Sequence, residues 1–170
     1  MSNPTDQANR DRLQPCLLDR LTDNRPTERS ETRESSMMSL SAYRASVLRD
    51  LETLLNSPER FNARRERDFP EAATSVLNYG APDLSGRTVS GISVEELRKR
   101  LTESVRRFEP RVLRGSLSLE VHQSVAGSSR NGFEIAITGE LWAQPAPEPL
   151  SLRSRLDLDT GRYTLENAGG

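Results

Sequence analysis

The stretch SVRRFEPRVL, residues 104–113, marks the change from helix to sheet in this chain of 170 residues. Its helical part ends just before Glu109-Pro110-Arg111, and an alternating strand is expected from about Val112. Proline has no backbone N–H and moves the preceding residue out of the helical region. We therefore expect Glu109 and Arg111 to be fixed, extended neighbours. Their side chains would point to the same side and be presented together on one surface.

Two amphipathic helices are predicted before this junction. Apolar residues recur every three or four positions from Ser39 to about Ser57, and again from Val94 to Phe108. Ser93, with a glutamate three residues later, matches a capping box at the start of the second helix. Each helix thus has one apolar face to bury.

The segment ERFNARRERDFP, residues 59–70, is expected to be a proline-bounded loop after the first helix. Its four arginines could bind phosphate or an acidic partner. Glu59, Glu66 and Asp68 lie among them, however, and cancel much of their charge. We therefore interpret the segment as a solvated loop.

Consecutive strands are predicted after the junction. Apolar and polar residues alternate over 113–121, 133–141 and 150–158, which is the period of a half-buried strand. The turn residues 159–161, Asp-Thr-Gly, then lead into a last strand that reaches Leu165. Helices followed by strands predict an α+β fold, with two principal amphipathic helices packed on an antiparallel sheet of three to four strands.

The last two strands would form a C-terminal edge hairpin. Unpaired N–H and C=O groups on such an edge recruit strands from other chains. An ordinary sheet, in which charged edge residues such as Arg153 and Arg155 discourage pairing, fits the sequence equally well.

Residues 1–38 are rich in polar side chains and predict a flexible N-terminal segment ahead of a single domain at 39–170. A short amphipathic helix is expected within this segment, near residues 15–22. Its apolar residues are Leu17, Leu18 and Leu21. Two interpretations stay open, because this helix could fold back onto its own domain or dock on a partner.

The composition excludes several function classes. With 24 basic and 25 acidic residues, the formal net charge of -1 gives no overall field for nucleic acid or an anionic membrane. Cys16 and His122 are the only residues of their types, so we expect no disulfide, no metal site and no cofactor. No apolar run approaches the roughly 18 to 20 residues of a membrane span, so we expect a cytoplasmic protein without membrane insertion.

Five sequence blocks carry a family resemblance. They are LLDRLTD at 17–23, SVLRDLETLLNS at 46–57, FPEAATSVLNYGAPDLSG at 69–86, FEPR at 108–111 and LDLDTGRY at 156–163. Together they resemble the TssE family of type VI secretion baseplate proteins. That family is part of the phage-tail baseplate wedge proteins, which bear an older lysozyme-like name. The resemblance covers roughly residues 13–165.

The resemblance implies a structural subunit of a contractile injection machine. Such a subunit sits beside the baseplate proteins TssF, TssG and TssK, recruited to an inner-membrane-associated baseplate, and starts the sheath of TssB and TssC. The family's Glu-Pro-Arg signature, which holds the helical core bundle of the wedge, matches Glu109, Pro110 and Arg111. Leu17, Leu18 and Leu21 would be a second docking segment.

The alternative is a peptidoglycan hydrolase, as the older family name suggests. Glycoside hydrolysis usually needs two carboxyl groups, one of them kept protonated. Glu109 is the candidate acid, but Arg111 beside it favours the ionised carboxylate, which is the wrong state for a general acid. No second carboxylate stands out, so we expect no catalysis.

Overall fold

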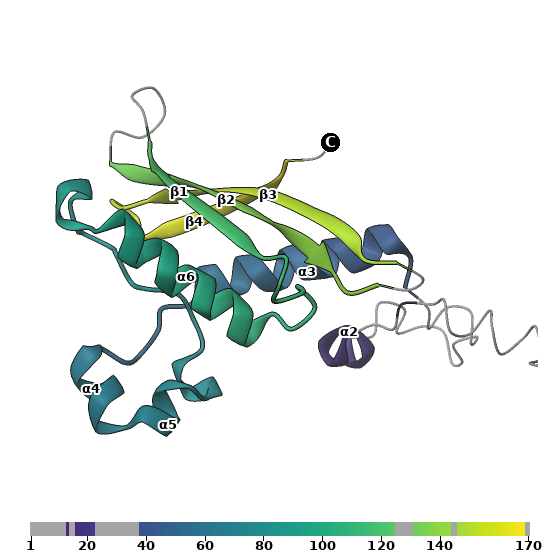
Figure 1. Cartoon of the computed structure of the whole chain (residues 1–170), viewed down its shortest axis with the longest axis horizontal. Coiled ribbons are helices and arrows are strands. Elements are labelled where there is room, and N and C mark those ends of the chain that lie inside the picture. The colour runs from purple at the N-terminus through teal and green to yellow at the C-terminus, as the bar shows by residue number, and fades with distance from the viewer. Residues whose placement is uncertain (1–12, 14–15, 23–37, 125–130, 144–145, 169–170) are drawn as a thin grey trace, which may run out of the picture.

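The computed structural model describes residues 13, 16–22, 38–124, 131–143 and 146–168. Within this part of the chain, a four-stranded antiparallel sheet lies over two long helices, α3 (Leu40–Leu55) and α6 (Val94–Phe108) (Figure 1). Each strand pairs with the next one along the chain. The predicted α+β fold class is therefore confirmed.

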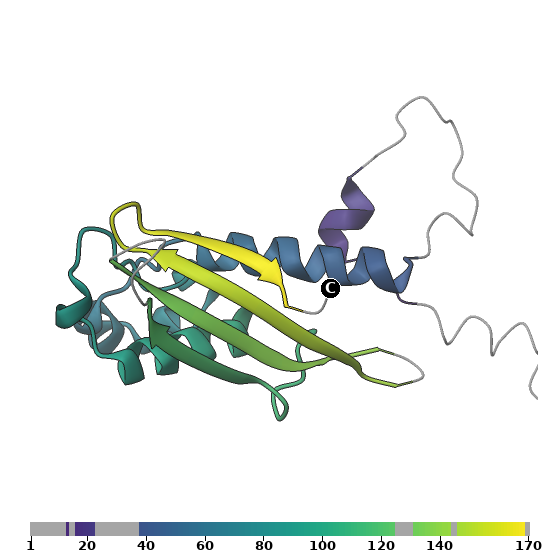
Figure 2. The ribbon, with the colours of Figure 1, turned by 90° about the horizontal axis from the view of Figure 1, so that it is seen from above.

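The four strands form a simple meander. They are β1 (Ser118–Gln123), β2 (Gly132–Leu141), β3 (Glu148–Asp157) and β4 (Arg162–Asn167). Figure 2 shows β1 and β4 at the two edges of the sheet, with α6 near β1 and α3 near β4. Because β3 pairs with β4 as well as β2, Arg153 and Arg155 lie on an interior strand. The description of these two arginines as edge residues was wrong.

The core lies between the helices and one face of the sheet. Alternate side chains of each strand point toward the helices, as the period of two predicted. The most deeply buried side chains include Val47, Leu51, Leu101, Val105, Phe133, Ile137 and Leu156. Exposed polar residues alternate with them and cover the other face.

Both long helices begin at a serine that caps the first turn. Ser39 Oγ accepts a hydrogen bond from the N–H of Ala42 at 3.2 Å, and Ser93 Oγ accepts one from the N–H of Glu96 at 3.3 Å. The predicted helix start at Ser93 is confirmed. Both helices therefore begin where their serines satisfy backbone N–H groups that have no partner within the helix.

Residues 59–80 form a lobe that leaves the domain after α3 and returns before α6. The lobe contains α4 (Ala63–Asp68), α5 (Pro70–Ala73) and the short 3-10 helix η1 (Val76–Asn78); a second 3-10 helix, η2 (Val89–Gly91), follows it. The prediction of a loop over 59–70 missed α4, which starts because Asn62 Oδ1 accepts a hydrogen bond from the N–H of Arg65 at 3.0 Å.

The first strand begins later than the alternation predicted. Val112 makes only an isolated bridge to Leu141, and the chain then turns before β1 starts at Ser118. In this turn Ser116 Oγ accepts a hydrogen bond from the N–H of Glu140 at 2.9 Å. The side chain of Ser116 thus satisfies the N–H of Glu140, which a backbone carbonyl would have bound if the strand were continuous.

The N-terminal segment is described only in part. A short helix, α2 (Leu17–Leu21), is present, and Leu13 forms an isolated antiparallel bridge with Met38. Most of the segment that was predicted to be flexible lies outside the described residues. Among the described helices, none combines the length and the apolar character needed to cross a membrane.

Candidate assembly surfaces

Glu109-Pro110-Arg111 forms a turn instead of an extended corner. The N–H of Val112 donates to the carbonyl of Glu109 at 3.2 Å, which places Pro110 at the second position of a β-turn, where its fixed φ is favoured. The Glu109 carboxylate accepts hydrogen bonds from the backbone N–H of Arg111 at 3.2 Å and from its Nε at 2.7 Å. The two side chains meet because the backbone reverses, and the predicted extended geometry was wrong.

The acid and the arginine are not presented together on one surface. Glu109 is only 3% exposed, while the side chain of Arg111 is 18% exposed and Pro110 is exposed. Glu109 is buried because it lies at the end of α6, under the turn that follows. Of the three signature residues, Pro110 is therefore the one that a partner can reach most easily.

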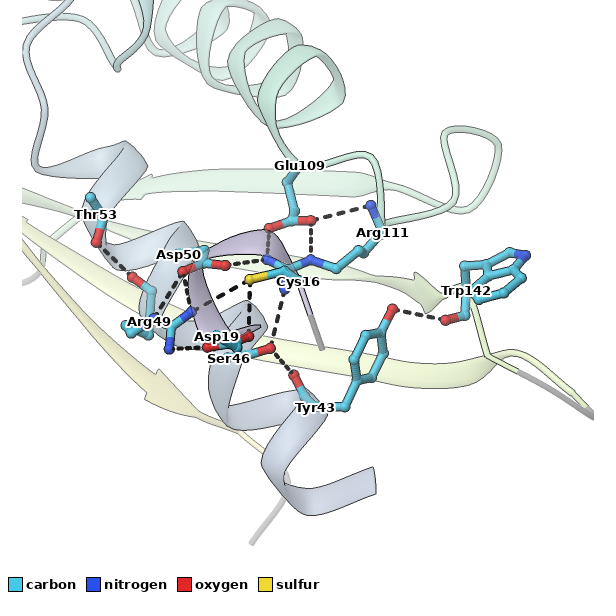
Figure 3. A network of polar contacts seen from close by, with 10 residues as sticks. All are labelled: Cys16, Asp19, Tyr43, Ser46, Arg49, Asp50, Thr53, Glu109, Arg111 and Trp142. Atoms are coloured by element: carbon cyan, nitrogen blue, oxygen red, sulfur yellow. Dashed lines mark hydrogen bonds and ion pairs between the residues drawn. The ribbon is translucent and has the colours of Figure 1, made fainter. Parts of the chain in front are cut away.

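Arg111 joins the turn to α3. Its Nη2 donates to Asp50 Oδ2 at 2.6 Å and also contacts the Glu109 carboxylate, and its Nη1 donates to Ser46 Oγ at 3.1 Å (Figure 3). Burial alone would lower the pKa of Arg111, but the hydrogen bonds and charges of Glu109 and Asp50 raise it. The guanidinium thus stays charged and links two carboxylates from different elements.

The ion pairs continue from Asp50 to the N-terminal segment. Arg49 contacts Asp50 Oδ1 at 2.8 Å and Asp19 Oδ1 at 2.6 Å. Asp19 in turn accepts a hydrogen bond from Cys16 Sγ at 2.9 Å. We call the alternating series Asp19, Arg49, Asp50, Arg111 and Glu109 the charge network; it connects α2, α3 and the turn after α6 (Figure 3).

The leucines of α2 face away from the domain. Leu17, Leu18 and Leu21 are 70%, 58% and 74% exposed. The sequence left open whether this helix folds back onto its own domain or docks on a partner. The structure shows a contact with the domain through Asp19, while the apolar side of α2 is left uncovered. The sequence could not show this, since the deciding partner, Arg49, lies 30 residues away.

Trp142 is a surface residue that the sequence reasoning missed. Its side chain is 53% exposed, and its backbone is held in place at both ends. The N–H of Trp142 donates to the carbonyl of Arg111 at 2.7 Å, and its carbonyl accepts from the hydroxyl of Tyr43 at 2.8 Å (Figure 3). As the only tryptophan of the chain, at the end of an alternating strand, it could have been noticed.

The free edge of β4 is partly covered by Asn56. The side-chain amide of Asn56 accepts from the N–H of Tyr163 at 3.0 Å and donates to its carbonyl at 2.9 Å, as a neighbouring strand would. The N–H of Ala168 donates to the carbonyl of Ser151 in β3 at 3.0 Å. In this register the backbone N–H and C=O groups of the even-numbered β4 residues bond to β3, and those of the odd-numbered residues point away from β3. The outward backbone groups of Leu165 therefore remain beyond the reach of Asn56.

A cleft of about 350 Å³ separates the lobe from α6. Glu59 and Glu66 both line it, and Arg100 Nη2 contacts their carboxylates at 2.6 Å and 2.9 Å. Burial raises the pKa of Glu59, and the charge of Arg100 opposes that rise. Among the described residues, no group of three or more acidic, histidine or cysteine side chains is arranged to hold a metal ion.

Comparison with protein families matches residues 41–146, more than half of the chain, to the family described as baseplate wedge protein gp25. The matched residues run from α3 to just beyond the end of β2 and include Glu109, Pro110 and Arg111. The comparison with curated proteins found no match. The comparison with solved structures found none either.

Proposed function

This chain belongs to the family of baseplate wedge protein gp25, and from that premise we propose that it is a structural wedge subunit of a type VI secretion baseplate. In this proposal it works in the cytoplasm, at a baseplate that is associated with the inner membrane. It binds TssF, TssG and TssK, and it starts the sheath of TssB and TssC. The observation that carries the proposal is the charge network, because it locks the Glu-Pro-Arg turn onto α3 inside the matched residues.

We assign partner binding to the residues around the turn that are exposed. The wedge surface, as we define it, consists of Pro110, Trp142, Leu17, Leu18 and Leu21. Tryptophan, tyrosine and arginine supply much of the binding energy of protein interfaces, and apolar side chains fill the buried core of such interfaces. Glu109 and Arg111 then act as positioning residues, since they hold Pro110 and the backbone of Trp142 in place.

The second part of the proposal is that β4 offers its edge to the first sheath strand. A strand that pairs on one side only is a template for another chain. Leu165 supplies outward N–H and C=O groups, whereas those of Tyr163 are occupied by Asn56. The incoming strand would therefore pair at Leu165.

Co-purification from the native strain tests the wedge surface. Trp142→Ala and Pro110→Ala should each reduce the recovery of TssF and TssG, because each removes an exposed apolar side chain while leaving the charge network intact. His122→Ala is the matched control, since His122 is also exposed but lies on the far face of the sheet. Equal recovery of both subunits with all three variants would contradict the proposal.

The hydrolase alternative finds little support in the geometry. The candidate acid, Glu109, is buried and its carboxylate is held by Arg111. The carboxylates of Glu59 and Glu66 share one nitrogen of Arg100, so a guanidinium occupies the space between them that a glycosidic bond would need. Clearing of purified peptidoglycan by the wild-type protein, lost in Glu109→Gln, would restore the alternative.

A further inference from the structure

The edge of β4 fixes where an added strand can pair. The outward backbone groups of Tyr163 are bonded to the side chain of Asn56, so an added strand cannot use them. The N–H and C=O groups of Leu165 point away from β3, and they form no other hydrogen bond within the described residues. The pairing of an added strand is therefore set at Leu165, and the side chains next to Leu165 decide which strand fits.

Glu166 is the charged residue beside this position. Its side chain is exposed on the open face of the sheet, which is the face turned away from the helices. Arg153 of β3 lies directly opposite Glu166 in the register. Neither side chain forms an ion pair with another described residue. The edge thus presents a carboxylate that has no partner on its outer side.

Charges of opposite sign face each other across the strands on the open face. Glu134 of β2 lies opposite Arg155 of β3, and Arg153 of β3 lies opposite Glu166 of β4. Side chains at directly opposite positions are about 5 Å apart, so opposite charges there stabilise a sheet and like charges destabilise it. A further strand that continues this order would place a positive charge beside Glu166.

We propose that the sheath strand that pairs at Leu165 carries a lysine or an arginine beside Glu166, an inference that rests on the strand addition proposed above. Successive side chains of a strand alternate between its faces. In either strand direction, the base is therefore next in sequence to the residue that pairs with Leu165. A strand with a base there gives Glu166 a partner, whereas a strand with an acid there meets a like charge. Glu166 thus determines specificity, because an edge carboxylate also discourages pairing with unsuitable strands.

Charge reversal at Glu166 tests the proposal in cells that carry a fluorescent sheath. Glu166→Lys should lower the number of sheaths about fivefold or more, because repulsion replaces attraction. Glu166→Gln removes the charge without repulsion and should cause a smaller loss. Glu120→Lys is the matched control, since Glu120 is an exposed acid on the same face but on the opposite edge strand, β1. It should form sheaths normally.

Each variant is also checked for folding and for wedge assembly. No described side chain forms a hydrogen bond or an ion pair with the Glu166 carboxylate, so its replacement removes no such contact from the domain. The thermal transition measured by circular dichroism and the recovery of TssF and TssG should therefore stay close to wild type. A loss of sheaths under these conditions then arises at the edge of β4.

A charge swap identifies the partner of Glu166. In the Glu166→Lys strain, the lysines and arginines of TssB and TssC are replaced by glutamate one at a time. Replacement of the base beside residue 166 should restore the sheaths, and the same replacement should reduce them in the wild-type strain. The proposal is overturned if no replacement restores the sheaths, or if Glu166→Lys forms sheaths normally while Leu165→Pro does not. Normal sheaths in Leu165→Pro would refute strand addition at this edge, and this proposal with it.

Discussion

Arg111 contacts the side chain of its neighbour Glu109 and two side chains of the distant helix α3, and these contacts explain why Glu109 can be buried. A carboxylate that leaves water needs hydrogen bonds and a compensating charge. Glu109 receives both from Arg111, through the backbone N–H and the guanidinium. Asp50 and Ser46 then accept hydrogen bonds from two further N–H groups of Arg111. The signature is therefore first a structural unit, on which any contact with partners depends.

Removing the carboxylate should lower stability markedly. Glu109→Ala leaves the largely buried guanidinium of Arg111 without its main partner, and breaking such a pair costs about 3 kcal/mol. We expect urea unfolding to show this loss in the free energy of unfolding. Asp68→Ala, which removes the exposed and long pair with Arg64 at 3.7 Å, serves as control and should change stability by less than about 1 kcal/mol. Equal stability of Glu109→Ala and wild type would show that the network contributes nothing to folding.

Asn56 is a second single residue with a structural role, because its side chain covers part of the edge of β4. Asn56→Ala removes two hydrogen bonds to the backbone of Tyr163, each contributing about 1 kcal/mol. It also uncovers one more outward N–H and C=O pair on the edge. We therefore expect lower stability together with more self-association, measured by analytical ultracentrifugation. Asn56→Asp keeps an acceptor for the N–H but loses the donor, so its self-association should be intermediate.

At the scale of elements, α2 is attached to the domain by charge and not by its apolar side. A helix of five residues is unstable alone, so its contacts with α3 must hold it. Arg49 supplies the contact that reaches Asp19, while the side chains of the three leucines remain mostly exposed. This arrangement leaves α2 poised to place its leucines on another subunit.

The attachment of α2 should depend on Arg49. In Arg49→Ala, residues 16–22 lose their ion pair with α3, worth about 0.5 to 1 kcal/mol for a partly exposed pair. Faster deuterium uptake in this segment, with little change elsewhere, is the expected result. Arg44→Ala removes a comparable pair from the same helix, with Glu148 at 2.8 Å, and should leave uptake in residues 16–22 unaltered.

Acid should release α2 in a defined direction. Burial alone would raise the pKa of Asp19, but hydrogen bonds from Arg49 and Cys16 and the charge of Arg49 lower it below its ordinary 3.8. A carboxyl with a lowered pKa in the folded state contributes stability above its unfolded pKa, and loses it as pH falls through the folded value. The amide NMR shifts of Leu17–Leu21 should therefore stay constant at neutral pH and move toward unstructured values only below about pH 3.8. Movement of these amide shifts at neutral pH would contradict the attachment of α2 through the Asp19 carboxylate.

The edge of β4 can be blocked without disturbing the sheet. The N–H of Leu165 points away from β3, so Leu165→Pro removes a donor that the β3–β4 ladder does not use. We expect normal wedge assembly but few fluorescent sheaths in cells that carry this variant. Leu165→Ala retains the N–H and should form sheaths normally. Sheaths at wild-type frequency in the proline variant would argue against strand addition at this edge.

At the scale of the whole molecule, the last two strands belong to the core as well as to the edge. Leu152, Leu156, Leu158 and Tyr163 are buried against the helices. Deletion of everything after Pro149 would therefore unfold the domain and could not test sheath initiation separately. We expect such a truncated chain to lack a cooperative thermal transition, as judged by circular dichroism. Point substitutions at the edge are the informative experiment.

The sequence by itself determined the architecture and the positions of most elements. The apolar periods of 3.6 and 2 located both long helices and all four strands, because each period depends only on which face of an element is buried. Pro110 fixed the end of α6, since proline cannot continue the helix. The turn residues 159–161, Asp-Thr-Gly, likewise indicated the hairpin between β3 and β4.

Only the tertiary structure decided which groups are covered and which are free. Partners far away in sequence determine four features of the fold. They are the anchoring of Arg111 to α3, the outward leucines on α2, the position of Asn56 on the edge of β4 and the inward turn of Glu59 and Glu66. Asn56 and Tyr163, for example, are 107 residues apart. A periodic pattern records the average environment of one element. It holds no information about which single side chain of another element lies beside it.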